Sequence, residues 1–159
     1  FNYAMMLYRN EASSPDANAG WRWLRRAAGA GLPQAQFNFA LLYDRGIGVP
    51  RSLPTAAEWY RRAAEQGHVD AQVSLASMYF VGQGVQRDDA AAARWYLAAA
   101  YGGNIGAQYI IASMYETGHG VARDTRLAAR WYLQAARQGD RIAREKYAAL
   151  QARIDAGTQ

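Results

Sequence analysis

The chain has 159 residues, of which 51% are apolar or aromatic, and a formal net charge of +5. No run of residues approaches the ~20 apolar positions of a membrane-spanning helix, so the sequence predicts no transmembrane segment. The absence of cysteine excludes a fold built on disulfides and leaves bacterial cytoplasm and periplasm equally open as the compartment.

The first 34 residues form a weak copy of a pattern that becomes regular further on. Trp23 and Gly31 keep the register of Trp59 and Gly67, but the glycine pair of the later copies is missing. The chain starts inside a helical pattern without an initiator Met, so we expect a truncated, divergent repeat (1–34) of a longer protein. A terminal repeat without its neighbour exposes an apolar face, which would allow dimerisation at this end.

Three full copies follow at a spacing of 36 residues. The motif Ala-x-x-Trp-Tyr begins at Ala56, Ala92 and Ala128. Alignment without gaps places the copies at 35–70, 71–106 and 107–142. A period of this length is typical of solenoids, in which each unit buries its apolar face against its neighbours.

Each full copy predicts two amphipathic helices. Apolar residues recur at helical spacing in both halves, for example at Ala35, Phe39 and Tyr43 in the first half. The second helix starts after an N-cap residue, and the left-handed conformation of a glycine ends it. The predicted caps are Ser52, Asp88 and Asp124, and the predicted terminating glycines are Gly67, Gly103 and Gly139.

A Gly-x-Gly-Val segment joins the two helices of each copy, as at Gly46 and Gly48. A phosphate-binding loop would need a preceding strand and a third glycine, and neither is present. We therefore interpret the glycines as positions of positive φ in a tight connection, with the valine packed beneath the loop.

From residue 143 the first-helix pattern continues through Tyr147 and then becomes more polar, with Gln151, Arg153 and Asp155. A polar outer surface suits the end of a solenoid. We expect residues 143–159 to form a C-terminal capping helix, which makes 1–159 a single repeat domain.

The combined pattern resembles a known family. It reads Ala-Gln-x-x-Leu/Phe/Ile-Ala-x-x-Tyr-x-x-Gly-x-Gly-Val, then an Asp or Ser cap, then Ala-x-x-Trp-Tyr-x-x-Ala-Ala-x-x-Gly. This is similar to the Sel-1-like repeat, a relative of the tetratricopeptide repeat, over nearly the whole chain. The resemblance implies an all-α fold, a right-handed α-solenoid, that acts as an adaptor gathering other proteins into complexes.

Some bacterial members of that family carry a disulfide between consecutive repeats. At the corresponding places this chain has Ala64 with Gln72 and Ala100 with Gln108. We therefore expect packing alone to stabilise the stack. The tryptophans Trp59, Trp95 and Trp131 are predicted to belong to the core.

The sequence offers no catalytic, metal or cofactor site. The only histidines, His68 and His119, lie far apart in the repeat register, without carboxylates at ligand spacing. Nucleophile motifs and paired carboxylates on one helical face are also missing, so we predict a protein that is not an enzyme.

Eight of the seventeen arginines interleave with the Trp-Tyr stripe on the second helices, which would form the convex outside of such a solenoid. Glu58 and Glu65 are mixed among them, so we interpret this face as solvated surface and not as a nucleic-acid site. These arginines are Arg22, Arg25, Arg26, Arg61, Arg62, Arg94, Arg130 and Arg137.

Binding residues are expected where the copies differ from one another. By resemblance to tetratricopeptide-like solenoids, the side of each first helix away from Ala40 and Tyr43 lines a concave groove. The candidates are Phe37, Leu41, Asp44, Asp70, Val73, Ser77, Phe80, Tyr109, Ser113 and Glu116. For Phe37, Val73 and Tyr109, which share one register position, packing between repeats is an equally open interpretation.

The candidate set mixes aromatic and apolar anchors with acids, which suits an extended or helical peptide with apolar side chains and some positive charge. We therefore predict a scaffold or adaptor that binds a peptide or protein of unknown identity. The alternative is a recognition or regulatory domain of a larger enzyme or envelope-associated protein.

Overall fold

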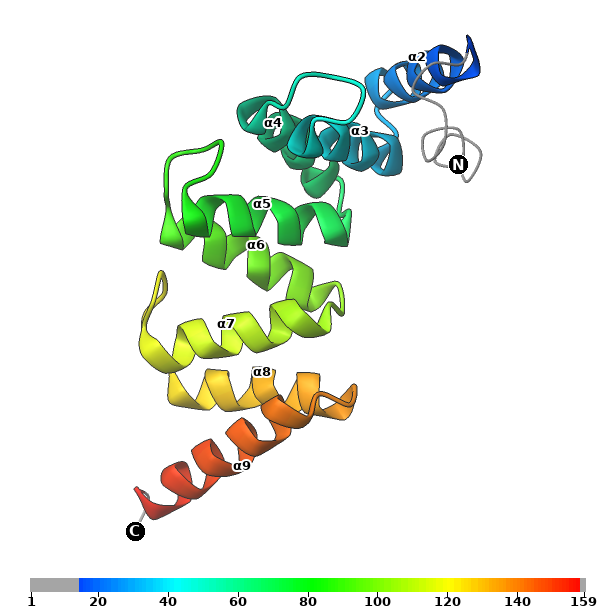
Figure 1. Ribbon diagram of the computed structural model, residues 1–159. Coiled ribbons are helices and arrows are strands. Elements are labelled where there is room, and N and C mark those ends of the chain that lie inside the picture. The colour runs from blue at the N-terminus through cyan, green and yellow to red at the C-terminus, as the bar shows by residue number, and fades with distance from the viewer. Residues whose placement is uncertain (1–14, 158–159) are drawn as a thin grey trace.

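The computed structural model describes residues 15–157, which are helical with no strand among them (Figure 1). Residues 1–14 of the predicted truncated repeat lie outside this range. The helices are α2 (Pro15–Gly29), α3 (Pro33–Arg45), α4 (Leu53–Glu65), α5 (Val69–Val81), α6 (Asp89–Tyr101), α7 (Ile105–Thr117), α8 (Thr125–Arg137) and α9 (Arg141–Ala156). Each helix packs on the next one in the chain, and the helices stack in sequence order from α2 to α9. The all-α solenoid prediction is confirmed.

Side chains cap the N-termini of helices α4 to α9. Ser52, Asp88 and Asp124 accept hydrogen bonds from backbone N–H groups in the first turns of α4, α6 and α8, as predicted. Three of the first helices also have side-chain caps, which were not predicted, whereas α3 follows Leu32 and has none. Their caps are His68 for α5, Asn104 for α7 and Asp140 for α9.

The glycine pairs have the predicted positive φ, for example 78° at Gly118 and 69° at Gly120. The second glycine of a pair also allows close contact between repeats. A Cβ on Gly120 would lie 2.2 Å from the backbone oxygen of Asp89, and a Cβ on Gly84 would lie 2.6 Å from that of Leu53. The loop of one repeat therefore packs against the start of the second helix of the repeat before it.

The core is built from small and aromatic side chains. Ala40, Ala76 and Ala112 are fully buried, which lets paired helices approach closely. Trp131 is buried and Trp59 and Trp95 are half-buried at the core, but the tyrosine that follows each tryptophan is buried more deeply. The exposed fraction is 1% for Tyr60 and 0% for Tyr132.

Packing is not the only force that joins the repeats, so that expectation is wrong. Gln72 Nε2 donates to the backbone oxygen of Ala64 (3.1 Å), and Gln108 Nε2 donates to that of Ala100 (3.1 Å). These are the two pairs of positions at which the family resemblance would place disulfides. A buried hydrogen bond thus connects consecutive repeats where some relatives have a covalent bond.

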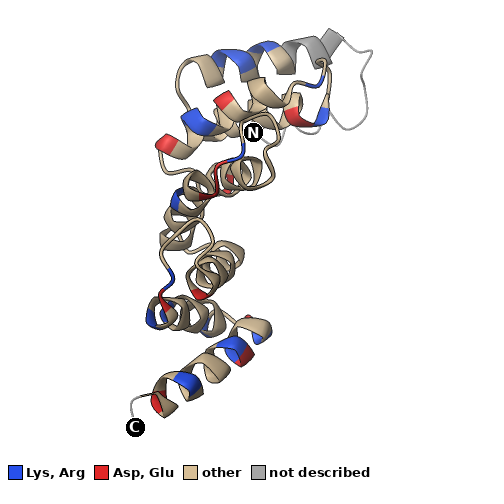
Figure 2. Ribbon diagram, turned by 90° about the vertical axis from the view of Figure 1, so that its left-hand side faces the viewer, with Lys and Arg blue, Asp and Glu red and all other residues tan. Residues whose placement is uncertain are grey.

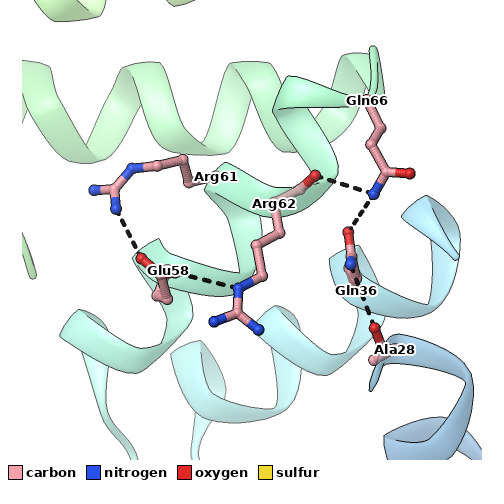
Figure 3. Close-up of polar contacts among 6 residues, drawn as sticks. All are labelled: Ala28, Gln36, Glu58, Arg61, Arg62 and Gln66. Atoms are coloured by element: carbon pink, nitrogen blue, oxygen red, sulfur yellow. Dashed lines mark hydrogen bonds and ion pairs between the residues drawn. The ribbon is translucent and has the colours of Figure 1, made fainter. Parts of the chain in front are cut away.

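A second glutamine completes this contact in two of the three copies. Gln66 Nε2 donates to Gln36 Oε1 (2.8 Å), and Gln36 Nε2 donates to the backbone oxygen of Ala28 (3.3 Å; Figure 3). Gln138 and Gln108 form the same pair at 2.8 Å. In the middle copy Gly102 stands where Gln66 and Gln138 lie, and no described residue donates to Gln72 Oε1.

Candidate protein-binding surface

All ten predicted binding residues lie on α3, α5 and α7. We call the surface formed by these ten residues the first-helix face. Phe80 is its most accessible large apolar side chain, with an exposed fraction of 38%. Phe37, Leu41, Val73 and Tyr109 are half-buried.

Phe37 and Tyr109 pack against the buried tyrosines of the second helices. The ring of Phe37 lies 5.8 Å from that of Tyr60 and stacks on His68 at 4.6 Å. The ring of Tyr109 meets that of Tyr132 edge-on at 5.3 Å. At this register position the side chains contribute to packing and keep part of their surface accessible.

Two carboxylates of this face each accept a hydrogen bond from a buried tyrosine. Tyr60 Oη donates to Asp44 Oδ2 (3.1 Å), and Tyr132 Oη donates to Glu116 Oε2 (2.9 Å). We call these the acid–tyrosine pairs. Burial, followed by the neighbouring carboxylate, raises the pKa of both tyrosines above the ordinary value, so the hydroxyls stay protonated as donors.

The middle copy lacks an acid–tyrosine pair because Phe80 stands at the register position of Asp44 and Glu116. The Phe80 ring contacts His119 edge-on, with centroids 5.5 Å apart. His119 Nε2 in turn lies 3.0 Å from Asp89 Oδ2. His119, for which the sequence indicated no role, therefore supports the exposed aromatic ring of the preceding repeat.

The structure brings Asp44, Val73 and Ser77 together around one pocket of about 300 Å³ between α3, α4 and α5. The remaining lining residues are Leu53, Tyr60, Ser74, Met78 and Gln83. The other seven candidates lie outside this pocket. Leu41 packs against the core of the first copy, while Asp70 is exposed on the first turn of α5.

Lys146 also contributes to this surface, although it was not among the predicted binding residues and lies within the predicted capping helix (143–159). Its Nζ lies 3.4 Å from Glu116 Oε2, so α9 supplies a cation to the second acid–tyrosine pair. Lys146 has the same register as Ser74, which lines the pocket of the first pair. Comparing residues at this register position across copies would have revealed the difference.

The arginines of the second helices are exposed, apart from the half-buried Arg61, and acidic residues lie among them (Figure 2). Glu58 pairs with Arg61 at 2.7 Å and with Arg62 at 3.2 Å (Figure 3). The Arg62 guanidinium also lies over the Trp59 ring at 4.5 Å. A second hollow, of about 370 Å³, lies on this side beside Tyr101 and Trp131.

The described residues contain no group of three or more His, Cys, Asp or Glu side chains that could hold a metal ion. Between residues 15 and 157, no helix is both long enough and apolar enough to cross a membrane.

The stacked helix pairs with glycine-containing connections define an α-solenoid of the helical-repeat class. Within that class, the chain belongs to the Sel1 repeat family, whose model matches residues 1–32, 33–68, 69–104 and 105–140. Proteins of this family are generally interaction scaffolds without enzymatic activity, and their repeats typically bind proteins.

Solved structures agree with this assignment. A Sel1 repeat protein from Oxalobacter formigenes is 38% identical, with a TM-score of 0.75 over 81% of this chain and 97% of that one. A protective antigen of uropathogenic Escherichia coli with an SLR fold is also 38% identical, with a TM-score of 0.73 over 78% of this chain. The match spans 27% of that antigen.

The cysteine-rich protein B of Helicobacter pylori has the same fold at 18% identity, with a TM-score of 0.60 over 80% of this chain and 92% of that one. A search of curated protein sequences gave no match.

Proposed function

We propose that this chain is a protein-interaction scaffold that binds an extended or helical segment of a partner protein along the first-helix face. The observation that carries the proposal is the pocket containing Asp44, Val73 and Ser77, together with the exposed ring of Phe80 on the same helix as Ser77. A pocket beside an accessible aromatic anchor is an arrangement typical of peptide-binding surfaces.

The chemistry of this face favours a partner with apolar and basic side chains. Phe80 offers apolar area that a partner side chain would remove from water. Asp44 and Glu116 place negative charge on the same face, and Asp70 adds an exposed carboxylate at the start of α5. Positive charge on the partner would complement these groups and raise the rate of association.

A second candidate function is that of a recognition domain within a longer protein. The match to the Escherichia coli antigen, which this chain would cover only in part, supports it. In that case the first-helix face would serve the same recognition, while other segments would supply enzymatic or envelope-associated functions.

The test is a pull-down that compares the proteins retained by the wild type with those retained by two folded variants. The Phe80→Ser variant removes the exposed aromatic ring of the first-helix face, and Arg94→Glu/Arg130→Glu changes exposed residues of the second helices. Each variant is first checked for helical content and thermal midpoint by circular dichroism.

We expect a partner that is retained by the wild type and by the arginine variant but lost from the Phe80→Ser variant. A partner lost only from the arginine variant would contradict it and would assign binding to the second helices.

A further inference from the structure

We propose that the pocket between α3 and α5 binds the cationic side chain of a lysine or arginine from the partner, with the Asp44 carboxylate as its counter-ion. This inference rests on the proposed function and specifies one contact of it. The site consists of Asp44, Tyr60 and Ser74, with Val73 and Met78 on its walls.

The third copy shows such a site with its cation in place. Tyr132 Oη donates to Glu116 Oε2, and Lys146 Nζ approaches the same oxygen at 3.4 Å. The lysine comes from the following helix, α9, and the Glu116 side chain is largely shielded, with an exposed fraction of 19%. Within this chain, therefore, an acid–tyrosine pair already binds an ammonium group.

The first copy has the same pair without the cation. Tyr60 Oη donates to Asp44 Oδ2 at 3.1 Å, but Ser74 stands at the register position of Lys146. No lysine or arginine among the described residues forms an ion pair with the Asp44 carboxylate. Arg51 Nε approaches Asp44, yet it donates to the backbone oxygen at 2.8 Å and not to the side chain.

The replacement of a lysine by a serine leaves space as well as unpaired charge. The pocket of about 300 Å³ lies between Asp44 and Ser74, where the shorter side chain does not reach across. The Ser74 hydroxyl donates to the backbone oxygen of Asp70 at 2.9 Å and also interacts with the Tyr60 hydroxyl, but it supplies no positive charge to Asp44. An incoming ammonium or guanidinium would find the carboxylate accessible.

The pocket walls suit the whole side chain of a basic residue and not its charge alone. Val73 and Met78 can contact the methylene stem, while the charged end reaches the carboxylate. The Tyr60 hydroxyl orients Asp44 before binding, which lowers the entropic cost of a charge-assisted hydrogen bond.

The middle copy lacks the features of a cation site. Phe80 replaces the acid, and Ile110 occupies the register position of Ser74 and Lys146. The face therefore presents a cation pocket in the first copy and an apolar anchor in the second. We expect the bound segment to carry a basic residue that reaches the pocket of the first copy and an apolar residue that contacts Phe80 in the second.

The first experiment uses a lysine supplied by the chain itself. Ser74→Lys places a lysine at the register position of Lys146, next to Asp44. We expect Ser74→Lys to raise the thermal midpoint in the wild-type background and to raise it less, or to lower it, in the Asp44→Asn background. In the third copy the matched substitutions are Lys146→Ser and Glu116→Gln, and we expect Lys146→Ser to lower the thermal midpoint more in the wild-type background than in the Glu116→Gln background. An equal effect of Ser74→Lys in both backgrounds would overturn the proposal.

The second experiment uses a phage-displayed library of random dodecapeptides selected on the wild type. We expect selected peptides to carry Lys or Arg and to bind at least about tenfold more weakly to Asp44→Asn and to Ser74→Lys, since a hydrogen bond to a charged group is lost or blocked. Replacement of the peptide's basic residue by norleucine should weaken binding similarly.

The outcomes separate this inference from the proposed function. Peptides that lose binding to Phe80→Ser but bind equally to the wild type and to Asp44→Asn would overturn the cation pocket and leave the first-helix face as the binding surface. A selection in which no peptide depends on either set of residues would overturn both.

Discussion

At the residue scale, the tyrosine after the repeat tryptophan has two roles in the first and third full copies. Tyr60 and Tyr132 fill the core with their rings, and their hydroxyls reach the carboxylates of the first-helix face. The core and the candidate binding surface are thus connected through single side chains, and a change in one affects the other.

Because the pKa of these tyrosines is raised, we expect the protein to lose stability at alkaline pH. Their pKa is raised in the folded state, so their contribution to stability is fully present below about pH 10, the ordinary tyrosine pKa, and declines as the pH rises above it. The Tyr60→Phe/Tyr132→Phe variant should lose stability less steeply over this range. Urea denaturation of both proteins, from neutral pH upwards, measures the difference.

At neutral pH the same double variant should be less stable than the wild type by about 1–3 kcal/mol for each lost hydrogen bond to a carboxylate. Parallel pH dependence of the two proteins would show that Tyr60 and Tyr132 do not govern the alkaline decline.

The buried glutamines allow a matched comparison within one protein. Gln108 makes two hydrogen bonds, with Ala100 and Gln138, whereas Gln72 makes one and has an unpaired Oε1. We expect Gln108→Met to destabilise the fold more than Gln72→Met, by about 1 kcal/mol, the usual net value of one hydrogen bond. Thermal and urea denaturation of the two variants would measure this, and the reverse order would contradict it.

At the scale of the elements, the connecting loops position neighbouring repeats. Gly84 and Gly120, each the second glycine of its pair, contact the start of the preceding second helix so closely that no side chain fits there. The loop is therefore part of the contact between repeats as well as a connection within one repeat.

Substitutions of Gly120 and Gly139 by alanine distinguish the effect of this contact from that of backbone strain. Both have positive φ, but a Cβ on Gly139 would meet nothing within 4 Å, whereas on Gly120 it would meet the Asp89 backbone. Gly139→Ala should cost roughly 1 kcal/mol from strain, and Gly120→Ala should cost clearly more. Equal shifts in the urea midpoint would mean that the loop contact contributes nothing.

Much of this architecture could be predicted from the sequence because repeated positions mark structural constraints. The helix pairs, the Ser and Asp caps and the positive φ of the glycines follow from local rules. The caps His68, Asn104 and Asp140 were missed because their residue type varies between copies.

The contact of Lys146 with Glu116 could not be inferred from helix patterns, since it joins α7 to α9 and depends on packing. The same is true of the pocket beside Asp44, whose walls come from three helices. The positions of the candidates on the first helices were predictable, but their division into a pocket, an aromatic anchor and an already paired carboxylate was not.

At the scale of the whole molecule, each repeat is stabilised by its neighbours, so we expect α9 to stabilise the helices before it. In α9, Ala143 and Leu150 are almost fully buried, and Lys146 pairs with Glu116. We expect removal of residues 141–159 to expose the apolar surface of α8, lower the thermal midpoint and promote self-association. Light scattering and circular dichroism would test this; an unchanged midpoint with a monomeric mass would contradict the capping role.

We propose that partners bind along α3, α5 and α7. The most direct measurement is the perturbation of backbone amide chemical shifts in the isotopically labelled chain on titration with a dodecapeptide selected as above. We expect the perturbed amides to cluster on these helices, around Asp44, Ser77 and Phe80. Perturbations confined to α4, α6 and α8 would contradict it and would assign binding to the arginine-bearing side.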